Sequence, residues 1–329
     1  MPITEFPPPL GTLTMREDLA AYFETGATAW QGGIVANVAA KVVCIFSDPA
    51  KGERHGYTFD GWTEPDEHGS LYWYTGAGSR GPQQLSGDNA KLLKHREKDR
   101  RVFLFVAAGK APGRDAVVHR YVGEFVVDPD EPYEELLGRD ADRLPRRVYV
   151  FRLRPKDPAL VDVRESDAQQ PAQTSDALFM PDFDMTPRLG PVEFHGADET
   201  EMHPAVGPRR VDRREGRLRS RFAQHLEALG HQVGSFQLTI PGESRPFPVD
   251  LYDATDHVLF EIKSKSKRNE IRMALGQLLD YRRHIPGEDL RTAILLPEEP
   301  SEDLTDLIHQ AGVHLVYQDG EGFEGLPLT

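Results

Sequence analysis

The chain has 329 residues, a formal net charge of −14 and a single cysteine, Cys44. One cysteine excludes an intramolecular disulfide and a zinc site built from cysteines, and the length suits two domains joined by a connector. No apolar stretch approaches the ~20 residues needed to cross a bilayer. The N-terminus has neither a basic nor an apolar leader region. We therefore expect a protein of the bacterial cytoplasm with no membrane partner.

Residues 1–154 are predicted to form a β-rich domain. Glycine, proline and aspartate clusters separate four apolar runs that are typical of strands, at residues 42–46, 102–106, 121–127 and 147–153. Helices are predicted near residues 16–23 and 88–98. A curved, partly closed sheet of roughly five to seven strands is typical of ~150 residues with this pattern.

The most distinctive part of this domain combines aromatic residues with glycines. The stretches are Phe59-Asp-Gly-Trp62, His68-Gly69, Tyr74-Thr75-Gly76-Ala-Gly78 and Asn89-Ala-Lys-Leu92. Aromatic faces stack on planar groups, and glycine lets the backbone approach a ligand closely. The alternative is that these aromatics form the core of a small barrel. Strand alternation makes Trp73 a core residue whichever way Tyr74 faces.

This arrangement, over residues 56–127, resembles the SRA domain, a PUA-type module that flips a modified cytosine out of DNA. The resemblance implies that the flipped base stacks between Trp62 and Tyr74. Thr75 would lie near the 5-substituent, with Gly76 beside it.

Two departures from the SRA pattern concern polar contacts and the gap left by the base. Pro65 stands where the family has the aspartate that binds cytosine. Glu64 and Asp66 flank it and are candidates for base binding, but the polar contact itself stays unassigned. The loop between Gly78 and Asn89 is short. Arg80, Gln83 and Gln84 are its candidates to fill the gap, and Arg80 is also expected to contact the DNA backbone.

Residues 155–208 have the composition of an acidic linker. They contain eleven acidic and three basic residues, with abundant proline and glutamine and little periodicity. We expect this segment to separate the N-terminal domain from a C-terminal domain at residues 209–329.

The C-terminal domain is predicted to alternate helices and strands. Helices are expected at residues 213–229, 271–281 and 302–310, and strands at 247–251, 258–262, 291–297 and 313–317.

Two carboxylates and one lysine in this domain suggest phosphodiester chemistry. Asp250 precedes Glu261 by eleven residues, and Glu261 and Lys263, two apart on one strand, point to the same face. Two hard oxygen donors suit Mg²⁺, and a lysine beside them can orient a water or stabilise phosphate oxygens. The alternative is an ordinary surface strand that ends in a charged Glu-x-Lys pair.

Residues 209–319 resemble the PD-(D/E)xK nuclease superfamily in the order of their elements and in these residues. The resemblance implies that Asp250, Glu261 and the Ile262 backbone carbonyl bind Mg²⁺, with Mn²⁺ as a substitute. It implies that Lys263 is catalytic, that Glu215 is the acidic residue of the first helix, and that Gln277 with Tyr281 forms the superfamily's Gln-x-x-x-Tyr feature.

Two basic runs flank these residues despite the acidic chain. Residues 209–221 contain seven arginines against two acids, and residues 263–272 contain five basic residues against one acid. We expect Arg217, Lys265, Lys267 and Arg268 to contact DNA phosphates. For any single run, the alternative is a solvated helix face.

The sequence thus predicts an α+β protein with two domains, a curved barrel-like SRA/PUA-type domain followed by an α/β PD-(D/E)xK nuclease core. The expected activity is that of a modification-dependent restriction endonuclease. It would bind double-stranded DNA carrying 5-methylcytosine or 5-hydroxymethylcytosine and act as a homodimer. Two alternatives stay open: a non-cleaving sensor with a degenerate nuclease fold, and a structure-specific repair nuclease.

Overall fold

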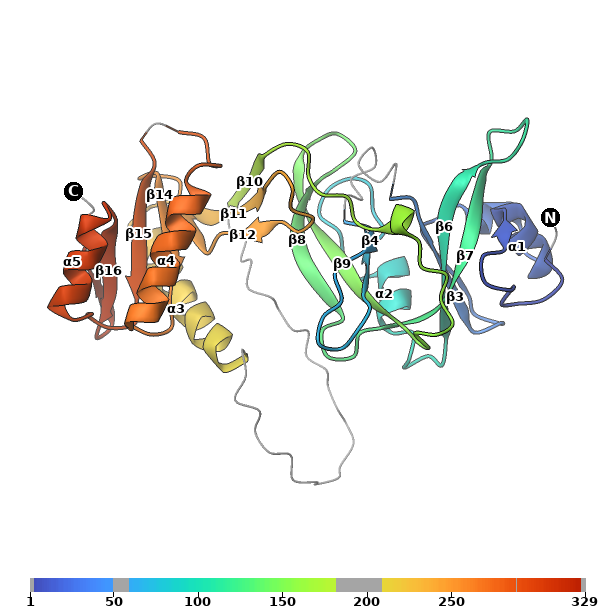
Figure 1. Cartoon of the computed structure of the whole chain (residues 1–329), viewed down its shortest axis with the longest axis horizontal. Coiled ribbons are helices and arrows are strands. Elements are labelled where there is room, and N and C mark those ends of the chain that lie inside the picture. Colours follow the sequence, from blue (N-terminus) through green and yellow to red (C-terminus); the bar gives the residue numbers. More distant parts are fainter. Residues whose placement is uncertain (1–2, 50–58, 182–208, 288, 327–329) are drawn as a thin grey trace, which may run out of the picture. The chain divides into compact units, whose positions relative to one another are not determined.

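A computed structural model describes residues 3–49, 59–181, 209–287 and 289–326. The chain divides into an N-terminal unit that ends at Pro171 and a C-terminal unit that begins at Ala172. Figure 1 labels their helices and strands. No helix in the described ranges is long and apolar enough to span a membrane.

The N-terminal unit is built on one nine-stranded sheet. Its strands are β1 (Leu13–Thr14), β2 (Ile34–Asn37), β3 (Val42–Ser47), β4 (Gly61–Trp62), β5 (Tyr72–Thr75), β6 (Arg101–Lys110), β7 (Val117–Val127), β8 (Tyr133–Arg139) and β9 (Pro145–Pro155). The order across the sheet is β2-β3-β6-β7-β9-β5-β4, with β1 paired to β7 and β8 paired to β9. Helices α1 (Arg16–Tyr22) and α2 (Gly87–Leu93) and short 3₁₀ turns at Ala27–Trp30 and Glu165–Asp167 complete it.

The four predicted strands of this unit are confirmed as β3, β6, β7 and β9. The sheet has more strands than the five to seven expected, because several are too short or too polar to read as apolar runs. Strand β8, for example, carries Glu134, Glu135 and Arg139. The helix predicted at residues 88–98 is shorter and ends at Leu93.

Strand β5 separates two buried clusters by the alternation of its side chains. Tyr72 and Tyr74 belong to the cluster that contains Phe125 and Phe151. Trp73 points the other way, among Leu136, Val148 and Val150. Trp73 is 1% exposed, so its predicted place in the core is confirmed.

The segment expected to be an acidic linker is partly folded. Its first residues, up to Pro171, belong to the N-terminal unit, where buried Arg120 pairs with Asp162 and Asp167. Residues Asp176–Pro181 form strand β10, which pairs with β11 of the C-terminal unit. Composition misled the expectation because two of its acidic side chains are partners of a buried arginine. Residues 182–208 lie outside the described ranges.

The connection between the units is correspondingly short. Gln169 still belongs to the N-terminal unit, since its amide and side chain donate to the carbonyls of Trp62 and Phe59. Ala172 already belongs to the C-terminal unit, where it exchanges hydrogen bonds with Gly242 and Glu243. Gln170 and Pro171 lie between these residues, and the Gln170 side chain donates to the Ala168 carbonyl at 3.1 Å.

The C-terminal unit is an eight-stranded sheet with helices on both faces. Its further elements are α3 (Arg209–Ala228), β11 (Val233–Thr239), β12 (Phe247–Pro248), β13 (Leu251–Asp253), β14 (Val258–Ile262), α4 (Arg268–Tyr281), β15 (Arg291–Leu296), α5 (Glu302–Gln310), β16 (His314–Asp319) and β17 (Gly322–Glu324). The order is β10-β11-β13-β14-β15-β16-β17, with β12 paired to β11. Strands β14, β15 and β16 run parallel, and the other pairs are antiparallel.

The side chains of β14 alternate between the two faces of this sheet and pack against the helices on both. Phe260 and Ile262 pack with Leu218 and Phe222 of α3. Leu259, between them in sequence, packs with the cluster that contains residues of α4 and α5. Glu261 shares the parity of Leu259, so its side chain lies on the face that α4 covers.

All three predicted helices and the strands at β14, β15 and β16 are confirmed, with small shifts of their ends. The strand expected at residues 247–251 is divided into β12 and β13, with Val249 and Asp250 between them. Strand β11 was not predicted, because glycine, serine and glutamine interrupt its apolar residues. Helix α5 follows Ser301, carries Glu302 and Asp303 in its first turn, and stops before Gly312, whose φ is +69°.

Candidate functional site

Asp250 lies in the gap between β12 and β13 and is held by the next strand. The Ile262 amide donates to Asp250 Oδ2 at 2.7 Å. Strand β13 begins at Leu251, which pairs with Phe260, so the Ile262 amide faces beyond the end of β13. In an extended strand the amide and carbonyl of one residue point the same way. The Ile262 carbonyl therefore faces the same side as Asp250.

Glu261 and Lys263 share one face of β14, as their spacing predicts. Lys263 Nζ donates to Glu261 Oε1 at 2.6 Å and to Gln277 Oε1 at 2.8 Å. Gln277 in turn donates to the hydroxyl of Tyr281 at 3.4 Å. Helix α4 thus orients Lys263 through the side-chain amide of Gln277. Gln277 lies four residues before Tyr281, on the same helical face.

Glu215 joins this group from α3. Its Oε1 accepts a hydrogen bond from the Ser264 amide at 3.1 Å, directly after Lys263. The structure therefore brings together all five side chains that the sequence assigned to catalysis: Asp250, Glu261, Lys263, Glu215 and Gln277. Arg219, which the sequence did not single out, donates to the Asp250 carbonyl at 3.2 Å.

Two buried carboxyl groups of this cluster have pKa values above their ordinary range. Burial raises the pKa of Asp250, and burial together with the Asp250 charge raises the pKa of Glu261 to about 8. Burial alone lowers the pKa of Lys263, but the charge of Glu261 and its hydrogen bond raise it above the ordinary value. When both carboxyl groups are ionised, they exceed the charge of the one ammonium, and a bound cation can neutralise the difference. Their oxygens, with the Ile262 carbonyl, are the donor types that Mg²⁺ prefers.

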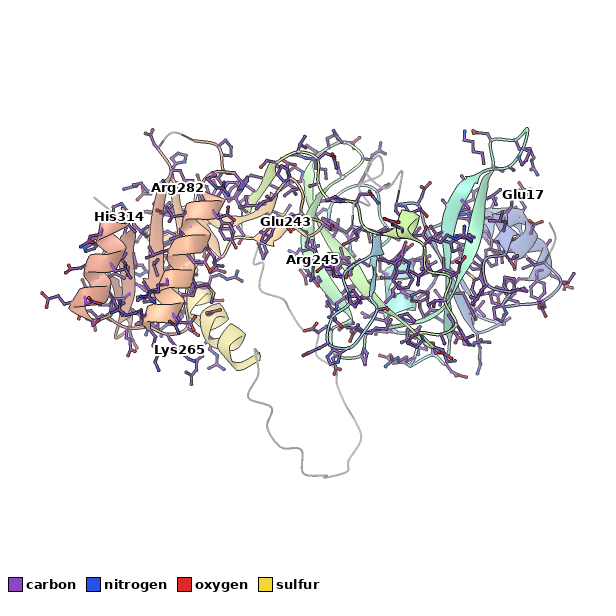
Figure 2. All side chains as sticks on the ribbon, viewed as in Figure 1. Glu17, Glu243, Arg245, Lys265, Arg282 and His314 are labelled. Carbon is purple, nitrogen blue, oxygen red and sulfur yellow. The ribbon has the colours of Figure 1, made fainter. Side chains whose placement is uncertain are left out.

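A cavity of about 420 Å³ lies beside this cluster. We call it the basic cavity, because Arg214, Arg217, Arg221, Lys265 and Lys267 line it. Lys265 is labelled in Figure 2, where it lies close to α3. Three of the residues expected to contact DNA phosphates, Arg217, Lys265 and Lys267, therefore come together.

The other two expected phosphate contacts have carboxylate partners. Arg268 pairs with Asp303 of α5. Arg80 pairs with Asp142 at 2.9 Å, within the N-terminal unit.

In the N-terminal unit, the two rings expected to stack on a base are buried. Trp62 is 7% exposed and meets Tyr72 edge-on, with ring centroids 5.3 Å apart. Tyr74 is 3% exposed and belongs to the same cluster, and its hydroxyl lies 2.8 Å from where a side chain on Gly33 would begin. In this structure both rings occupy one face of the sheet as core residues.

Thr75 and Gly76 continue β5 into a tightly bonded turn. The Thr75 amide donates to Asp60 Oδ1 at 2.7 Å. A Cβ on Gly76 would lie 2.9 Å from Asn89 Oδ1 and 3.0 Å from Gln83 Oε1, so only glycine fits. Asn89 binds both backbone groups of Ala77. The motif residues therefore tie the end of β5 to α2.

Gln83 is 3% exposed and donates to the Gly76 carbonyl while accepting from the Tyr149 amide. Gln83 therefore joins β5 to β9. The prediction that it could fill the gap left by the flipped base is wrong. Gln84 is exposed.

Asp66 lies on the opposite face from Tyr74. Its carboxylate accepts from Arg152 and Arg154, and Arg154 above all holds the pKa of Asp66 at about 2. Arg152 is paired with Trp73, and directly paired residues share a face. The expected contact between Asp66 and the base is therefore not supported, because two arginines distant in sequence draw it to the other face. Glu64 is exposed.

Asp60 is the carboxylate that does lie beside Tyr72 and Thr75. It accepts from Ser47 Oγ at 2.6 Å, and Ser47 accepts from the Tyr72 hydroxyl at 2.8 Å. Burial raises the pKa of Asp60 to about 6, despite the hydrogen bonds from Ser47 and Thr75. Its position within the apolar Phe59-Asp-Gly-Trp62 stretch was the available sequence signal.

Residues 12–177, about half of the chain, match the family described as the ScoMcrA-like SRA domain. The chain belongs to this family through its N-terminal unit, as the SRA resemblance implied. Among curated proteins, none matches the chain.

Several solved structures are similar at low identity. The sulfur binding domain and SRA domain of ScoMcrA, complexed with phosphorothioated DNA, are 19% identical with a TM-score of 0.34. That match covers 47% of this chain and 43% of the ScoMcrA chain, so this chain spans less than half of it. The SUVH5 SRA domain in complex with fully methylated CG DNA is 22% identical with a TM-score of 0.33, over 49% of this chain and 97% of that one. The DNA modification-dependent restriction endonuclease AspBHI is 10% identical with a TM-score of 0.31, over 97% of this chain and 87% of that one.

Proposed function

We propose that the protein is a modification-dependent restriction endonuclease, in which the SRA-type unit reads a modified cytosine and the C-terminal unit hydrolyses nearby phosphodiester bonds. The observation that carries the catalytic half is the convergence of Asp250, Glu261 and Lys263 at one point of a sheet. The reading half is supported by membership of an SRA domain family. A PD-(D/E)xK core is the interpretation that accounts for these residues together.

The cluster suits metal-assisted hydrolysis of a phosphodiester. Mg²⁺ bound by Asp250, Glu261 and the Ile262 carbonyl would supply a nucleophilic water and neutralise developing charge, and Mn²⁺ is the expected substitute. Lys263, kept protonated by Glu261, stabilises the phosphate oxygen on which negative charge grows. Gln277 fixes the direction of the Lys263 ammonium, and Glu215 holds the backbone that follows it.

The reading unit is proposed to take a flipped 5-methylcytosine or 5-hydroxymethylcytosine between Trp62 and Tyr74, with Thr75 and Gly76 beside it. Because both rings are packed in the core, base binding requires them to separate. The favourable energy of stacking, ~1–3 kcal/mol per base, is then opposed by the free energy needed to separate the two rings. A modification that adds contacts in the pocket favours the bound state.

Each catalytic cluster cuts one strand. We therefore propose that double-strand cleavage uses two copies of the chain, arranged as a homodimer. Phosphate contacts are blind to sequence, so the choice of target falls to the SRA-type unit.

Digestion of matched duplexes tests this function. The duplexes are identical in sequence and carry cytosine, 5-methylcytosine or 5-hydroxymethylcytosine, each incubated with Mg²⁺ or with EDTA. Cleavage of a modified duplex with Mg²⁺ alone is the expected result. Tight binding of modified DNA without cleavage would identify a sensor, and cutting of unmodified branched DNA would identify a structure-specific nuclease.

A further inference from the structure

The basic cavity collects positive charge from two separate segments. Arg214, Arg217 and Arg221 occupy positions i, i+3 and i+7 of α3 and so share one helical face. Lys265 and Lys267 come from the turn between β14 and α4. Its volume of about 420 Å³ is within the range of ligand-binding pockets.

These five cations lack carboxylate partners within the described part of the chain, and they are concentrated in the lining of one cavity. Some exposed cations elsewhere are paired, as in Lys41 with Asp99, Lys91 with Asp88 and Arg114 with Glu17. The chain carries 53 acidic residues against 39 basic ones, so partners are abundant. In the cavity the five cations share the lining with a single carboxylate, that of Glu298. The uncompensated charge indicates an anionic ligand.

Ser264 provides an independent indication of a ligand. Its side chain lines the basic cavity, the residue is 7% exposed, and its Oγ has no hydrogen-bond partner among the described residues. A buried hydroxyl without a partner costs about 1–3 kcal/mol. A ligand oxygen in the cavity would accept the hydrogen bond and remove that cost.

We propose that the basic cavity binds a phosphate of the DNA strand next to the bond that is cut. Phosphodiester oxygens are recognised by arginine, lysine and serine side chains, which are the groups present here. Ser264 directly follows Lys263, so a phosphate bound at its hydroxyl would be close in the strand to the phosphate at the catalytic cluster. The identity of this anion as a DNA phosphate rests on the proposed nuclease function.

The test measures DNA binding by the full-length protein without cleavage. A short unmodified duplex with a fluorescent label is titrated in EDTA, and anisotropy gives the Kd over a range of salt concentrations. The variants are Ser264→Ala and the double variant Arg217→Gln/Arg221→Gln. Arg283→Gln is the matched control, because Arg283 is an exposed arginine of the same unit paired with Asp280.

The double variant should bind about tenfold more weakly, and its slope of log Kd against log salt should fall by about one to two. Ser264→Ala should weaken binding by about threefold to tenfold without changing the slope, since it removes no charge. The control should bind as the wild type does.

Unchanged Kd and slope in the double variant would overturn the proposal. Loss of thermal stabilisation by inorganic phosphate with unchanged DNA binding would also overturn it, by assigning the cavity to a free anion. A protein that binds DNA through this cavity but never cleaves it would contradict the nuclease function alone.

Discussion

The backbone amide of Ile262 holds the Asp250 carboxylate at 2.7 Å across a place where the sheet ladder has ended. Asp250 belongs to no strand, so this bond, with Arg219 on the Asp250 carbonyl, fixes it relative to Glu261. A strand β13 extended by two residues would have placed Val249 opposite Ile262 and consumed the same amide. The short β13 is thus what leaves a backbone donor available to orient the carboxylate.

Lys263→Ala should abolish cleavage while leaving DNA binding intact. The variant loses the ammonium that neutralises Glu261 and stabilises phosphate oxygen, so we expect at least about a hundredfold slower cutting. Asp250→Ala should have the same phenotype. Nicking rates with Mg²⁺ and anisotropy with modified DNA measure the two properties, and Lys41→Gln in the other unit serves as control. Lost binding in a folded variant would contradict the separation of roles.

Trp62→Leu and Tyr74→Leu should each reduce the preference for modified over plain DNA by about 1–3 kcal/mol, because the ring that stacks on the base is lost. Leucine keeps these core positions apolar and fills part of the volume of the ring. Trp73→Leu is the control: it removes a ring of the same sheet that faces the opposite side. Competition binding measures the preference. If both variants keep it, the base pocket lies elsewhere.

Asp66→Asn should destabilise the fold without changing DNA preference. The substitution weakens the charged hydrogen bonds to Arg152 and Arg154, each worth about 1.5–3 kcal/mol. Chemical denaturation gives the loss of stability. Glu64→Gln, at an exposed position, should change stability by less than about 0.5 kcal/mol. A changed preference in Asp66→Asn would restore this carboxylate as a base contact.

Asp60 should make the stability of the fold depend on pH. Its folded-state pKa of about 6 exceeds the ordinary 3.8, so folding favours the protonated carboxyl. Stability is therefore lost as pH rises from about 4 to 6, by about 3 kcal/mol from this group. Asp60→Asn has no charge to bury, so its unfolding free energy should fall less over that range. Parallel pH profiles for the two proteins would show that Asp60 is not the cause.

A flexible insertion between Gln170 and Pro171 should broaden the cut positions. Two residues extend to at most about 7 Å, whereas ten added Gly/Ser residues contribute ~17 Å of root-mean-square reach. That reach corresponds to about five base pairs. Sequencing of product ends should show a narrow window for the native chain and a wider one for the variant. The same insertion at the exposed turn around Gly113 should leave the window unchanged.

Local periodicity was sufficient to predict the relative positions of functional residues that lie on the same element. The two-residue spacing of Glu261 and Lys263 predicts a shared face because strands alternate, and the structure confirms it. Long-range proximity needed the family resemblance or the structure itself. Nothing local to Glu215 shows that it meets the Ser264 amide, since that depends on where α3 crosses the sheet.

The same limit applies to the candidate base contact at Asp66. Its place beside Pro65 suggested a base contact, but its face of the sheet is decided by Arg152 and Arg154, more than eighty residues later. Charge composition misled in a similar way at residues 155–171, where acidic side chains complete a buried ion pair. Partners that are distant in sequence decide such cases, and a single sequence does not display them.

The unpaired cations of the basic cavity also bear on how the protein meets DNA. A net charge of −14 repels a polyanion from most directions, over a Debye length of about 8 Å at physiological ionic strength. A concentrated positive site on such a background acts as an electrostatic guide during diffusion. Under the proposed function, collisions of DNA in the wrong orientation would separate quickly, and those that bring the DNA backbone to α3 would persist. The acidic residues elsewhere in the chain would thereby favour encounters in which DNA approaches the basic cavity.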